Sequence, residues 1–324
     1  MSGGEKTAKA DPSFVYELRT VTEATARAAA RWIGRGDKSQ SDAAAVSAMH
    51  DALDRLSVGA TVVIGAREKD DGRAPYHGEL VGDAKSPFQY DLAVDPVEGT
   101  TYLAKGMTNA MAVMAMSPRG TMFDPRPCFY MEKFVADPRA QGKIDPTAST
   151  AEKLKQLADA LDKPISQVTV YVLEKPRHKD LVAAIYDAGA RVALYPAGDV
   201  AGALMAAIPE SGIDALMGTG GTPEGIIAAC AIRVMGGEFL GRLDPQLPSE
   251  QVAVREKGLD TSRWYRADEL VTSEEVYFCA TGITTGLLFS GVEQMHMHEQ
   301  TQTLMIAGPA GERQLLTTWH RLDS

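Results

Sequence analysis

The sequence predicts a mixed α/β protein, built from an α+β N-terminal half and an α/β C-terminal half. The main evidence is a regular alternation of short apolar segments with amphipathic segments in the C-terminal half. The apolar segments have the length of strands, and the intervening segments have the periodicity of helices. In order they are a strand at 168–173, a helix at 180–188, a strand at 191–196, a helix at 200–208, a strand at 214–218 and a helix at 222–235. This alternation is typical of helices packed on a mainly parallel sheet.

The N-terminal half begins with two predicted helices. In residues 13–34 apolar side chains recur at helical spacing, and a glycine-rich segment then ends the pattern. A second helix begins at Ser41 or Asp42 and runs to Leu53, because Ser and Asp are favoured where helices start. Strands are predicted at 60–65, 91–94 and 109–116, and the segment 122–135 is a candidate hairpin partner for the last of them.

The predicted domain organisation has three parts. Residues 1–12 are polar and small, and we expect a disordered tail there. A helix at 151–161 ends before Pro164, so we place the boundary near residue 165, with an N-terminal domain at 13–165 and a C-terminal domain at 166–324. The last strands are predicted at 276–280 and 302–307, after a polar segment at 249–273.

Composition and charge limit the possible partners. The 324 residues are 44% hydrophobic and 23% charged, which is typical of a soluble globular protein. The net charge of −10 and the lack of a basic stripe argue against a nucleic-acid partner. Three dispersed cysteines fit a reducing cytoplasm, and no apolar run reaches the ~20 residues that span a bilayer. We therefore expect a cytoplasmic protein with no membrane partner.

The most informative segment is DPVEGT, at 95–100, directly after an apolar strand. Asp95 and Glu98 supply the anionic oxygens that Mg²⁺ and Mn²⁺ prefer, and Pro96 stiffens the turn between them. Gly99 allows the backbone to approach a ligand closely, and a helix that begins near Thr100 would offer N–H groups to a phosphate. The alternative is an ordinary acidic surface turn.

Further clusters follow other predicted strands, where ligands of open α/β sheets collect. Glu224 starts a helix after a glycine-rich turn, and it could instead only complement the helix dipole. Lys175 and Arg177 could grip a phosphate, although solvated surface charges are an equal alternative. Asp199 could accept a sugar hydroxyl or only cap a helix, and Tyr130 taken alone would more often be a core residue.

Together these residues resemble the class II fructose-1,6-bisphosphatases, a family of the lithium-sensitive phosphatase superfamily. DPVEGT alone would specify only the superfamily, whereas GGTPEG and KPRH are specific to class II. The resemblance follows the family's order and covers nearly the whole chain from Val15 onward. The segments that carry it are RWIGRGDKSQSDAAAV (31–46), DLAVDPVEGT (91–100), FYMEK (129–133), EKPRH (174–178), GTGGTPEG (218–225) and ATGIT (280–284).

The resemblance implies a layered sugar-phosphatase fold, related to inositol monophosphatase, and a role for each matching residue. Asp42 would bind a first Mg²⁺ or Mn²⁺ ion, and Asp95, Glu98 and Glu224 would bind a second. Asp95, Glu98 and Thr100 would be catalytic, with Thr100 orienting the attacking water. The positions that match the binding of a sugar bisphosphate are Glu98, Gly99, Thr100, Tyr130, Lys175, Pro176, Arg177, Asp199 and Gly221.

The implied reaction is hydrolysis of the 1-phosphate of fructose 1,6-bisphosphate to give fructose 6-phosphate. The implied partner is this small molecule, and the implied assembly is a homodimer or homotetramer. Sedoheptulose 1,7-bisphosphate and an inositol phosphate are alternative substrates. A regulatory protein that binds a phosphosugar without turnover is the alternative outside the enzymes.

Two departures from the family pattern bear on the first metal site. The family has IGEGE where this chain has IGARE, so Ala66 replaces a carboxylate that would bind the first metal ion. The family's DGD is here Ala197-Gly198-Asp199, which removes an acidic substrate contact. Glu68 or Asp70 could restore the ligand, Arg67 could replace one cation electrostatically, or the chain could bind a phosphosugar and hydrolyse it poorly.

Overall fold

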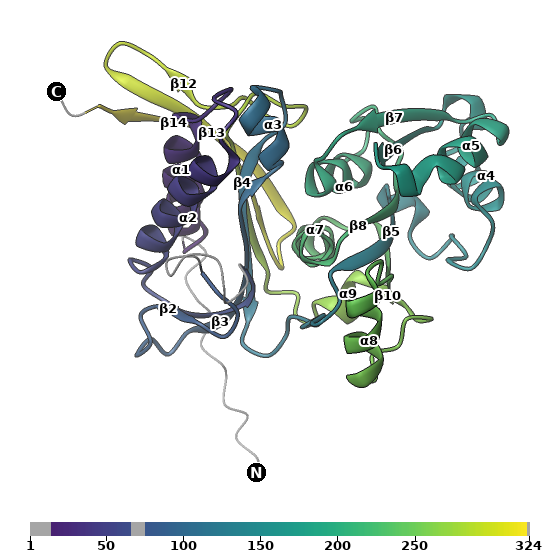
Figure 1. The fold of residues 1–324 in the computed structure, drawn as a ribbon, viewed down its shortest axis with the longest axis horizontal. Helices are drawn as coiled ribbons and strands as arrows, with labels where there is room; N and C mark the ends of the chain where they lie inside the picture. The colour runs from purple at the N-terminus through teal and green to yellow at the C-terminus, as the bar shows by residue number, and fades with distance from the viewer. Residues whose placement is uncertain (1–13, 66–74, 323–324) are drawn as a thin grey trace.

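The computed structural model describes residues 14–65 and 75–322. Within these residues the strands form two mixed sheets, with helices outside and between them, which confirms the mixed α/β class (Figure 1). The predicted disordered tail lies outside the described residues. The same is true of the segment 66–74, which contains Ala66, Arg67, Glu68 and Asp70.

The first sheet has the strand order β12-β13-β11-β4-β3-β1-β2, and β14 also pairs with β13. Only β1 and β3 run parallel among its described pairs. Its strands are β1 (Gly59–Ile64), β2 (Leu80–Gly82), β3 (Gln89–Glu98), β4 (Met111–Pro118), β11 (Tyr277–Gly282), β12 (Glu293–Gln294), β13 (His298–Ala307) and β14 (Glu312–Arg321). The last strand of the chain therefore lies at the edge of the sheet that the first strand helps to build.

The second sheet has the strand order β10-β9-β5-β8-β6-β7. Its strands are β5 (Tyr130–Ala136), β6 (Thr169–Leu173), β7 (Arg191–Tyr195), β8 (Ala215–Gly221), β9 (Glu238–Leu243) and β10 (Trp264–Arg266). Strand β6 is parallel to β7 and β8, but β5, β9 and β10 add antiparallel pairs. The expectation of a mainly parallel sheet is thus correct for only part of it.

The two sheets do not divide the chain near residue 165. Strand β5 was expected to form a hairpin with the segment 109–116, but it pairs with β8 and β9 of the second sheet. Strands β11 to β14 return to the first sheet, so residues 130–266 form the second sheet as one continuous segment. The alternation in the sequence marked the helices and strands correctly, but strand pairing depends on contacts between segments that are distant in the sequence.

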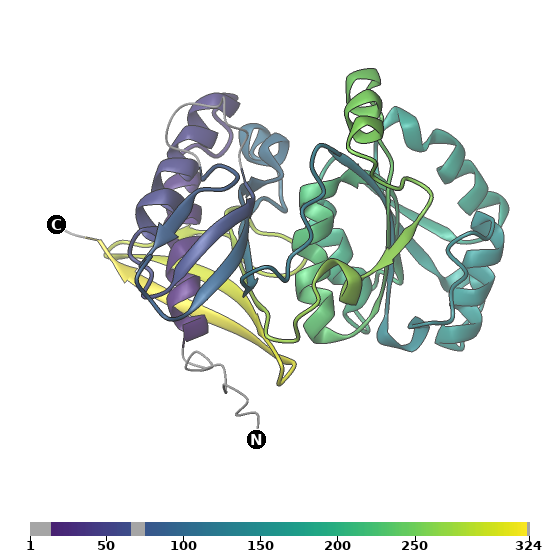
Figure 2. The ribbon, with the colours of Figure 1, turned by 90° about the horizontal axis from the view of Figure 1, so that it is seen from below.

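The helices and sheets stack in five layers, which Figures 1 and 2 show from two sides. Helices α1 (Val15–Ala30) and α2 (Lys38–Leu53) cover the outer face of the first sheet. Helices α6 (Asp199–Ala207) and α7 (Thr222–Met235) lie between the sheets, and α4 (Thr150–Leu161) and α5 (Lys179–Asp187) cover the outer face of the second. The short helices are α3 (Thr100–Lys105), α8 (Pro248–Glu256) and α9 (Ala267–Leu270).

The composition of the central helices fits their position. Every residue of α6 is buried, and α7 is buried from Gly225 to Ile232. A helix that is apolar on all sides must be covered on all sides, and here the two sheets cover it. By contrast, α4 buries one stripe that includes Leu154, Leu157 and Leu161.

The two segments that connect the sheets lie against each other. Met122 and Val271 form an isolated antiparallel bridge, and the amide of Phe123 donates to the Leu270 carbonyl over 2.8 Å. The buried carboxylate of Asp91 fixes the first connection, because it accepts hydrogen bonds from the amides of residues 120, 121 and 122. The first connection therefore leaves the first sheet at a defined place, and the second connection returns to that sheet beside it.

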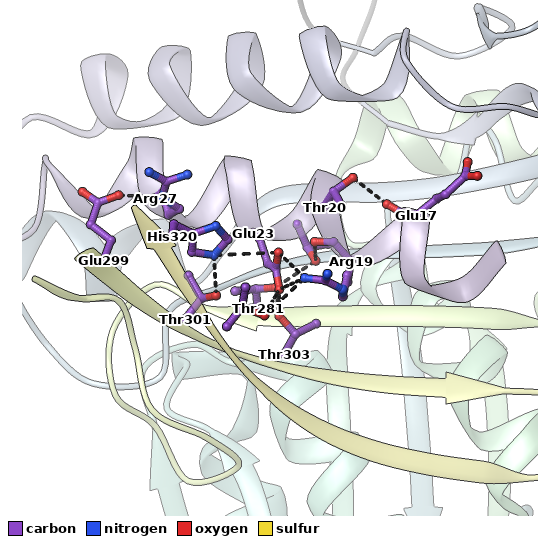
Figure 3. Close-up of polar contacts among 12 residues, drawn as sticks. Glu17, Arg19, Thr20, Glu23, Arg27, Thr281, Glu299, Thr301, Thr303 and His320 are labelled. Carbon is purple, nitrogen blue, oxygen red and sulfur yellow. Dashed lines mark hydrogen bonds and ion pairs between the residues drawn. The ribbon is translucent and has the colours of Figure 1, made fainter. Parts of the chain in front are cut away.

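A buried polar network joins α1 to the last two strands (Figure 3). Glu23 is 2% exposed, and both of its carboxylate oxygens lie 2.8 Å from Nη1 of Arg19. Thr318 donates a further hydrogen bond of 2.8 Å, and His320 lies 3.8 Å away. The charge of Glu23 is thus compensated by polar groups between α1 and the edge strand β14.

No helix in the described part of the chain is both long and apolar enough to span a membrane.

We expect Glu23→Gln to lower the free energy of unfolding by about 2–4 kcal/mol, because it leaves the partly buried Arg19 without its charged partner. The shift of the urea-unfolding midpoint would measure this. The control is Glu269→Gln, which breaks an exposed ion pair with Arg263 and should cost about 0.5 kcal/mol or less. Equal effects of the two substitutions would contradict a structural role for the buried network.

Candidate active site

A cavity of about 1250 Å³ lies between the two sheets, and residues of both sheets line it. The strand β3 and the start of α3 contribute from one side, and the ends of β6 and β8 with the starts of α6 and α7 contribute from the other. All but one of the residues predicted for the site line this cavity. They are Asp42, Asp95, Glu98, Gly99, Thr100, Tyr130, Lys175, Arg177, Asp199, Gly221 and Glu224.

The acidic turn owes its shape to an irregular strand end. The register of β3 on β4 shifts between Asp95 and Glu98, so both side chains reach the cavity although they are an odd number of positions apart along the strand. Asp95 also accepts a hydrogen bond of 3.0 Å from the amide of Val97, which stabilises the turn. Gly99 has a φ of +88°, and a Cβ there would lie 2.7 Å from the Tyr102 ring. A side chain at this position would therefore be strained and would clash.

The carboxylates of the cavity are buried or half-buried and repel one another. Burial, followed by the nearby charge of Glu224, raises the pKa of Asp95 to about 7. Burial also raises the pKa of Glu98 well above its usual range, and the charges of Asp95 and Glu224 add to this effect. For Glu224, burial and the charge of Asp199 raise the pKa, while Lys133 opposes them. Such a cluster favours a bound cation or bound protons.

Three buried carboxylate oxygens of the cavity have no hydrogen-bond partner among the described residues: Glu98 Oε2, Glu224 Oε2 and Asp199 Oδ2, of which only Asp199 Oδ2 lies in an ion pair. Glu98 Oε1 accepts a hydrogen bond of 3.1 Å from the amide of Val200, but Glu98 Oε2 is buried and unpaired. Glu224 Oε2 is buried and unpaired as well. Unpaired buried carboxylate oxygens are costly unless a cation or a proton satisfies them, and oxygen atoms are the ligands that Mg²⁺ and Mn²⁺ prefer. The donor set therefore fits a hard divalent ion.

Neither predicted metal site is fully assembled. As the side chains stand, no three acidic, histidine or cysteine residues of the described ranges form a ready group of metal ligands, and this includes Asp95, Glu98 and Glu224. Asp42 lines the cavity, and its charge contributes to the raised pKa of Asp95. It lies inside α2, because Asp37 caps that helix four residues before the predicted start at Ser41.

The GGTPEG turn brings glycine backbone against the carboxylates. A Cβ at Gly221 would lie 1.8 Å from Glu224 Oε2, and a Cβ at Gly220 would lie 2.0 Å from Asp199 Oδ2. No other residue type leaves room for both carboxylates in these positions. Lys133, which lies on β5, donates to the Gly221 carbonyl over 2.8 Å and pairs with Asp199 Oδ2 over 2.6 Å.

The KPRH segment presents two cations to the same cavity. Lys175 donates to the Pro196 carbonyl over 2.7 Å, and Arg177 donates from Nε to the Thr219 carbonyl over 2.8 Å. The Arg177 guanidinium lies 5.4 Å above the ring of Tyr130. Pro176 begins a short 3₁₀ turn and is the predicted site residue that does not line the cavity. Its fixed φ shapes the turn that carries its two neighbours.

His178 holds this segment against the GGTPEG turn. Its Nδ1 lies 2.7 Å from the Leu173 carbonyl, and its Nε2 accepts a hydrogen bond of 2.9 Å from the amide of Thr219. Burial lowers the pKa of His178, so the neutral tautomer with a proton on Nδ1 satisfies both contacts. The KPRH segment and the GGTPEG turn, which both contribute residues to the cavity, are thereby joined through one side chain.

Ala197 occupies the position where the family pattern has an acidic residue. Its carbonyl accepts hydrogen bonds from the hydroxyl groups of Tyr102 and Tyr171, over 2.6 and 2.8 Å. Gly198 follows with a φ of +91°, and Asp199 begins α6. Both tyrosines thus anchor the turn, and Asp199 is its acidic side chain at the cavity.

Sequence reasoning missed three polar residues of this site. Arg126 and His77 line the cavity, and Lys133 contacts two of its residues from behind. Arg126 lies just before the FYMEK segment, so its position was a usable signal. Lys133 is part of FYMEK, but its role depends on the pairing of β5 with β8, which the sequence did not predict.

The fold and the cavity define an α/β protein suited to bind a divalent cation together with an anionic ligand. The family model described as "Bacterial fructose-1,6-bisphosphatase, glpX-encoded" matches residues 12–320. The chain therefore belongs to the family of glpX-encoded bacterial fructose-1,6-bisphosphatases.

Similar curated proteins come from three other organisms. The protein from Acaryochloris marina named D-fructose 1,6-bisphosphatase class 2/sedoheptulose 1,7-bisphosphatase 2 is 39% identical over 332 residues, 95% of each chain. Proteins with the same double name from Thermosynechococcus vestitus and Crocosphaera subtropica are 40% and 39% identical, over 95% and 94% of this chain and 95% of each relative. The solved structure of an extragenic suppressor from Pyrococcus furiosus matches with 13% identity and a TM-score of 0.31, over 59% of this chain and 68% of that chain, and supports no argument.

The raised pKa of Asp95 predicts that metal-free protein loses stability as the pH rises. An unfolded Asp has a pKa of about 3.9, whereas folding raises the pKa of Asp95 to about 7. Between these two values the folded state keeps a proton that the unfolded state has released, so a rise in pH across this window favours unfolding.

We therefore expect Asp95→Asn to raise the melting temperature of EDTA-treated protein at pH 8 by a few degrees. Roughly 2–4 °C per kcal/mol is usual for large domains. The gain should shrink as the pH falls from 7 toward 4, in melts followed by circular dichroism. Glu132→Gln, which changes a carboxylate paired with Arg242 outside the cavity, is the control. Equal destabilisation by Asp95→Asn at pH 8 and pH 5 would contradict the repulsion described for this site.

Proposed function

We propose that this protein hydrolyses the 1-phosphate of fructose 1,6-bisphosphate and releases fructose 6-phosphate. The observation that carries the proposal is the content of one cavity. Unpaired oxygens of Glu98 and Glu224 lie in it together with the cations Lys175 and Arg177. The carboxylates can hold a metal ion that binds one phosphate, and the two cationic side chains can bind another. This arrangement fits a substrate with a phosphate at each end. Membership of the family supports the same substrate.

The carboxylates would hold the metal ions. Asp95, Glu98 and Glu224 would hold one Mg²⁺ or Mn²⁺ ion, and Asp42 would hold another. When bound, these ions supply positive charge that neutralises the phosphoryl oxygens during attack by water. The unpaired oxygens of Glu98 and Glu224 support this assignment, because they lack any other partner among the described residues.

The chain's own polar groups would bind and orient the substrate. Thr100 begins α3 directly after Gly99 and lines the cavity, and its hydroxyl would orient the attacking water. Lys175 and Arg177 would bind the 6-phosphate, with Tyr130 supporting the guanidinium. Asp199 would accept a hydrogen bond from a sugar hydroxyl, and Gly221 would let the sugar approach the backbone.

Sedoheptulose 1,7-bisphosphate is a second candidate substrate, because the three relatives are named both fructose 1,6-bisphosphatase and sedoheptulose 1,7-bisphosphatase. The five layers support a sugar-phosphatase fold, and the net charge of −10 supports a small-molecule partner rather than a nucleic acid. We also propose a homodimer or homotetramer in the cytoplasm. The family resemblance supports the assembly, and the three buried free cysteines support a reducing compartment.

Phosphate release from fructose 1,6-bisphosphate, with Mn²⁺ and Mg²⁺ titrated separately, tests the proposal. We expect metal-dependent turnover, and we expect Asp95→Asn or Glu224→Gln to lower kcat at least about 100-fold, since even outer-shell changes at metal sites cost 10–100-fold. Glu132→Gln should retain activity, because this residue lies outside the cavity. Folded protein with no turnover of either sugar bisphosphate would refute the enzyme and favour the regulatory binder.

Ala66→Glu tests the departure from the family pattern. If the first metal site is impaired by the lost carboxylate, the substitution should raise kcat at least about tenfold at limiting metal. The assay is phosphate release over a range of Mn²⁺ concentrations, with Ala66→Gln as the uncharged control. An unchanged metal dependence would mean that another residue already supplies the ligand.

A further inference from the structure

Lys133 is a buried cation behind the wall of the cavity. It lies near the middle of β5, and its side chain is 1% exposed. An ammonium group is strongly hydrated in water, so it is buried only where partners replace that water. Lys133 finds them in the turns that begin α6 and α7.

The contacts of Lys133 join two parts of the site. Its Nζ lies 2.6 Å from Asp199 Oδ2, at the start of α6, and donates to the Gly221 carbonyl over 2.8 Å, just before α7. Gly220 leaves room for the ammonium group, because a Cβ there would lie 3.1 Å from Nζ.

The ion pair affects one carboxylate in a set of four. Asp95, Glu98, Asp199 and Glu224 all line the cavity, but only Asp199 forms an ion pair within the described residues. Glu98 and Glu224 each keep a buried oxygen without a partner. The four acidic groups therefore differ in what they can offer a ligand.

We infer that Lys133 is a positioning residue that divides these carboxylates between two tasks. It holds Asp199 by Oδ2, so that Asp199 stays with the sugar and does not bind the divalent cation. Glu98 and Glu224, which have no such partner, remain for the cation. The sugar part of this inference rests on the proposed function, whereas the cation part does not.

This assignment has a definite consequence for a protein without the lysine. Asp199 and Glu224 lie against neighbouring glycines, since a Cβ at Gly220 would lie 2.0 Å from Asp199 Oδ2 and a Cβ at Gly221 would lie 1.8 Å from Glu224 Oε2. Without Lys133, the freed carboxylate of Asp199 can join a cation beside Glu224. Cation binding should then become tighter, while sugar binding becomes weaker because Asp199 has left its position.

Binding of Mn²⁺ alone tests the cation part. We expect Lys133→Met to lower the Kd for Mn²⁺ about tenfold, the size of effect that one nearby charge has on an ionisable group. Electron paramagnetic resonance of free Mn²⁺, without substrate, measures this. The matched control is Lys153→Met, since Lys153 is a buried lysine of α4 that lies over Trp264 and has no ion pair within the described residues.

The double variant Lys133→Met/Asp199→Asn decides whether Asp199 carries the effect. We expect its Kd for Mn²⁺ to return to within about twofold of the wild type, because no freed carboxylate remains. An unchanged or raised Kd in Lys133→Met would overturn the inference. So would a double variant that binds Mn²⁺ as tightly as Lys133→Met. If Lys133→Met does not fold, Lys133→Gln replaces it as the test. This substitution also removes the positive charge but keeps a hydrogen-bond donor for the Gly221 carbonyl.

Kinetics with fructose 1,6-bisphosphate test the sugar part. We expect Lys133→Met to raise KM about tenfold with kcat changed less than about threefold, and we expect Asp199→Asn to have no further effect on KM in that background. Independent effects of the two substitutions would overturn the sugar part. A wild type that does not turn over the sugar refutes the proposed function, and the Mn²⁺ measurements then still decide the role of Lys133.

Discussion

The hydrogen bond from the Val200 amide to Glu98 Oε1 joins the central helices to the first sheet where the cavity lies. Its donor is in the first turn of α6, and its acceptor ends β3. The start of a helix is a favourable place for a carboxylate, so the contact offsets part of the cost of burying Glu98. For this contact α6 must begin at Asp199. Gly198 permits that start, because its backbone adopts the left-handed conformation.

The central layer makes this contact possible. Helices α6 and α7 both begin at the cavity, so Asp199 and Glu224 enter it from the first turns of two neighbouring helices. Because both helices are apolar almost throughout, the two sheets enclose them, and the cavity forms at their starting ends. The acidic groups are therefore supplied in two pairs, one from the end of β3 and one from the starts of α6 and α7, and they meet only in the folded chain.

Much of this site was predictable, because chemistry was concentrated in short segments. DPVEGT and GGTPEG supplied Asp95, Glu98 and Glu224 correctly as cavity residues. The pairing of strands was not predictable. This explains why β5 was assigned to the wrong partner and why Lys133 was omitted. The sequence of β5 fits a strand in either sheet, and only its neighbours β8 and β9 decide which one. Contacts made through distant partners leave no local pattern in a chain.

The order of the strands along the chain has a consequence for synthesis on the ribosome. The second sheet uses only residues 130–266, so its strands can pair as soon as that segment has emerged. The first sheet contains β1 to β4 but lacks β11 and β13 until the end of translation. Strand β4 ends at Pro118 and β11 begins at Tyr277, so β4 keeps one edge open while about half of the 324-residue chain is made. The second sheet can thus be complete before the first sheet closes.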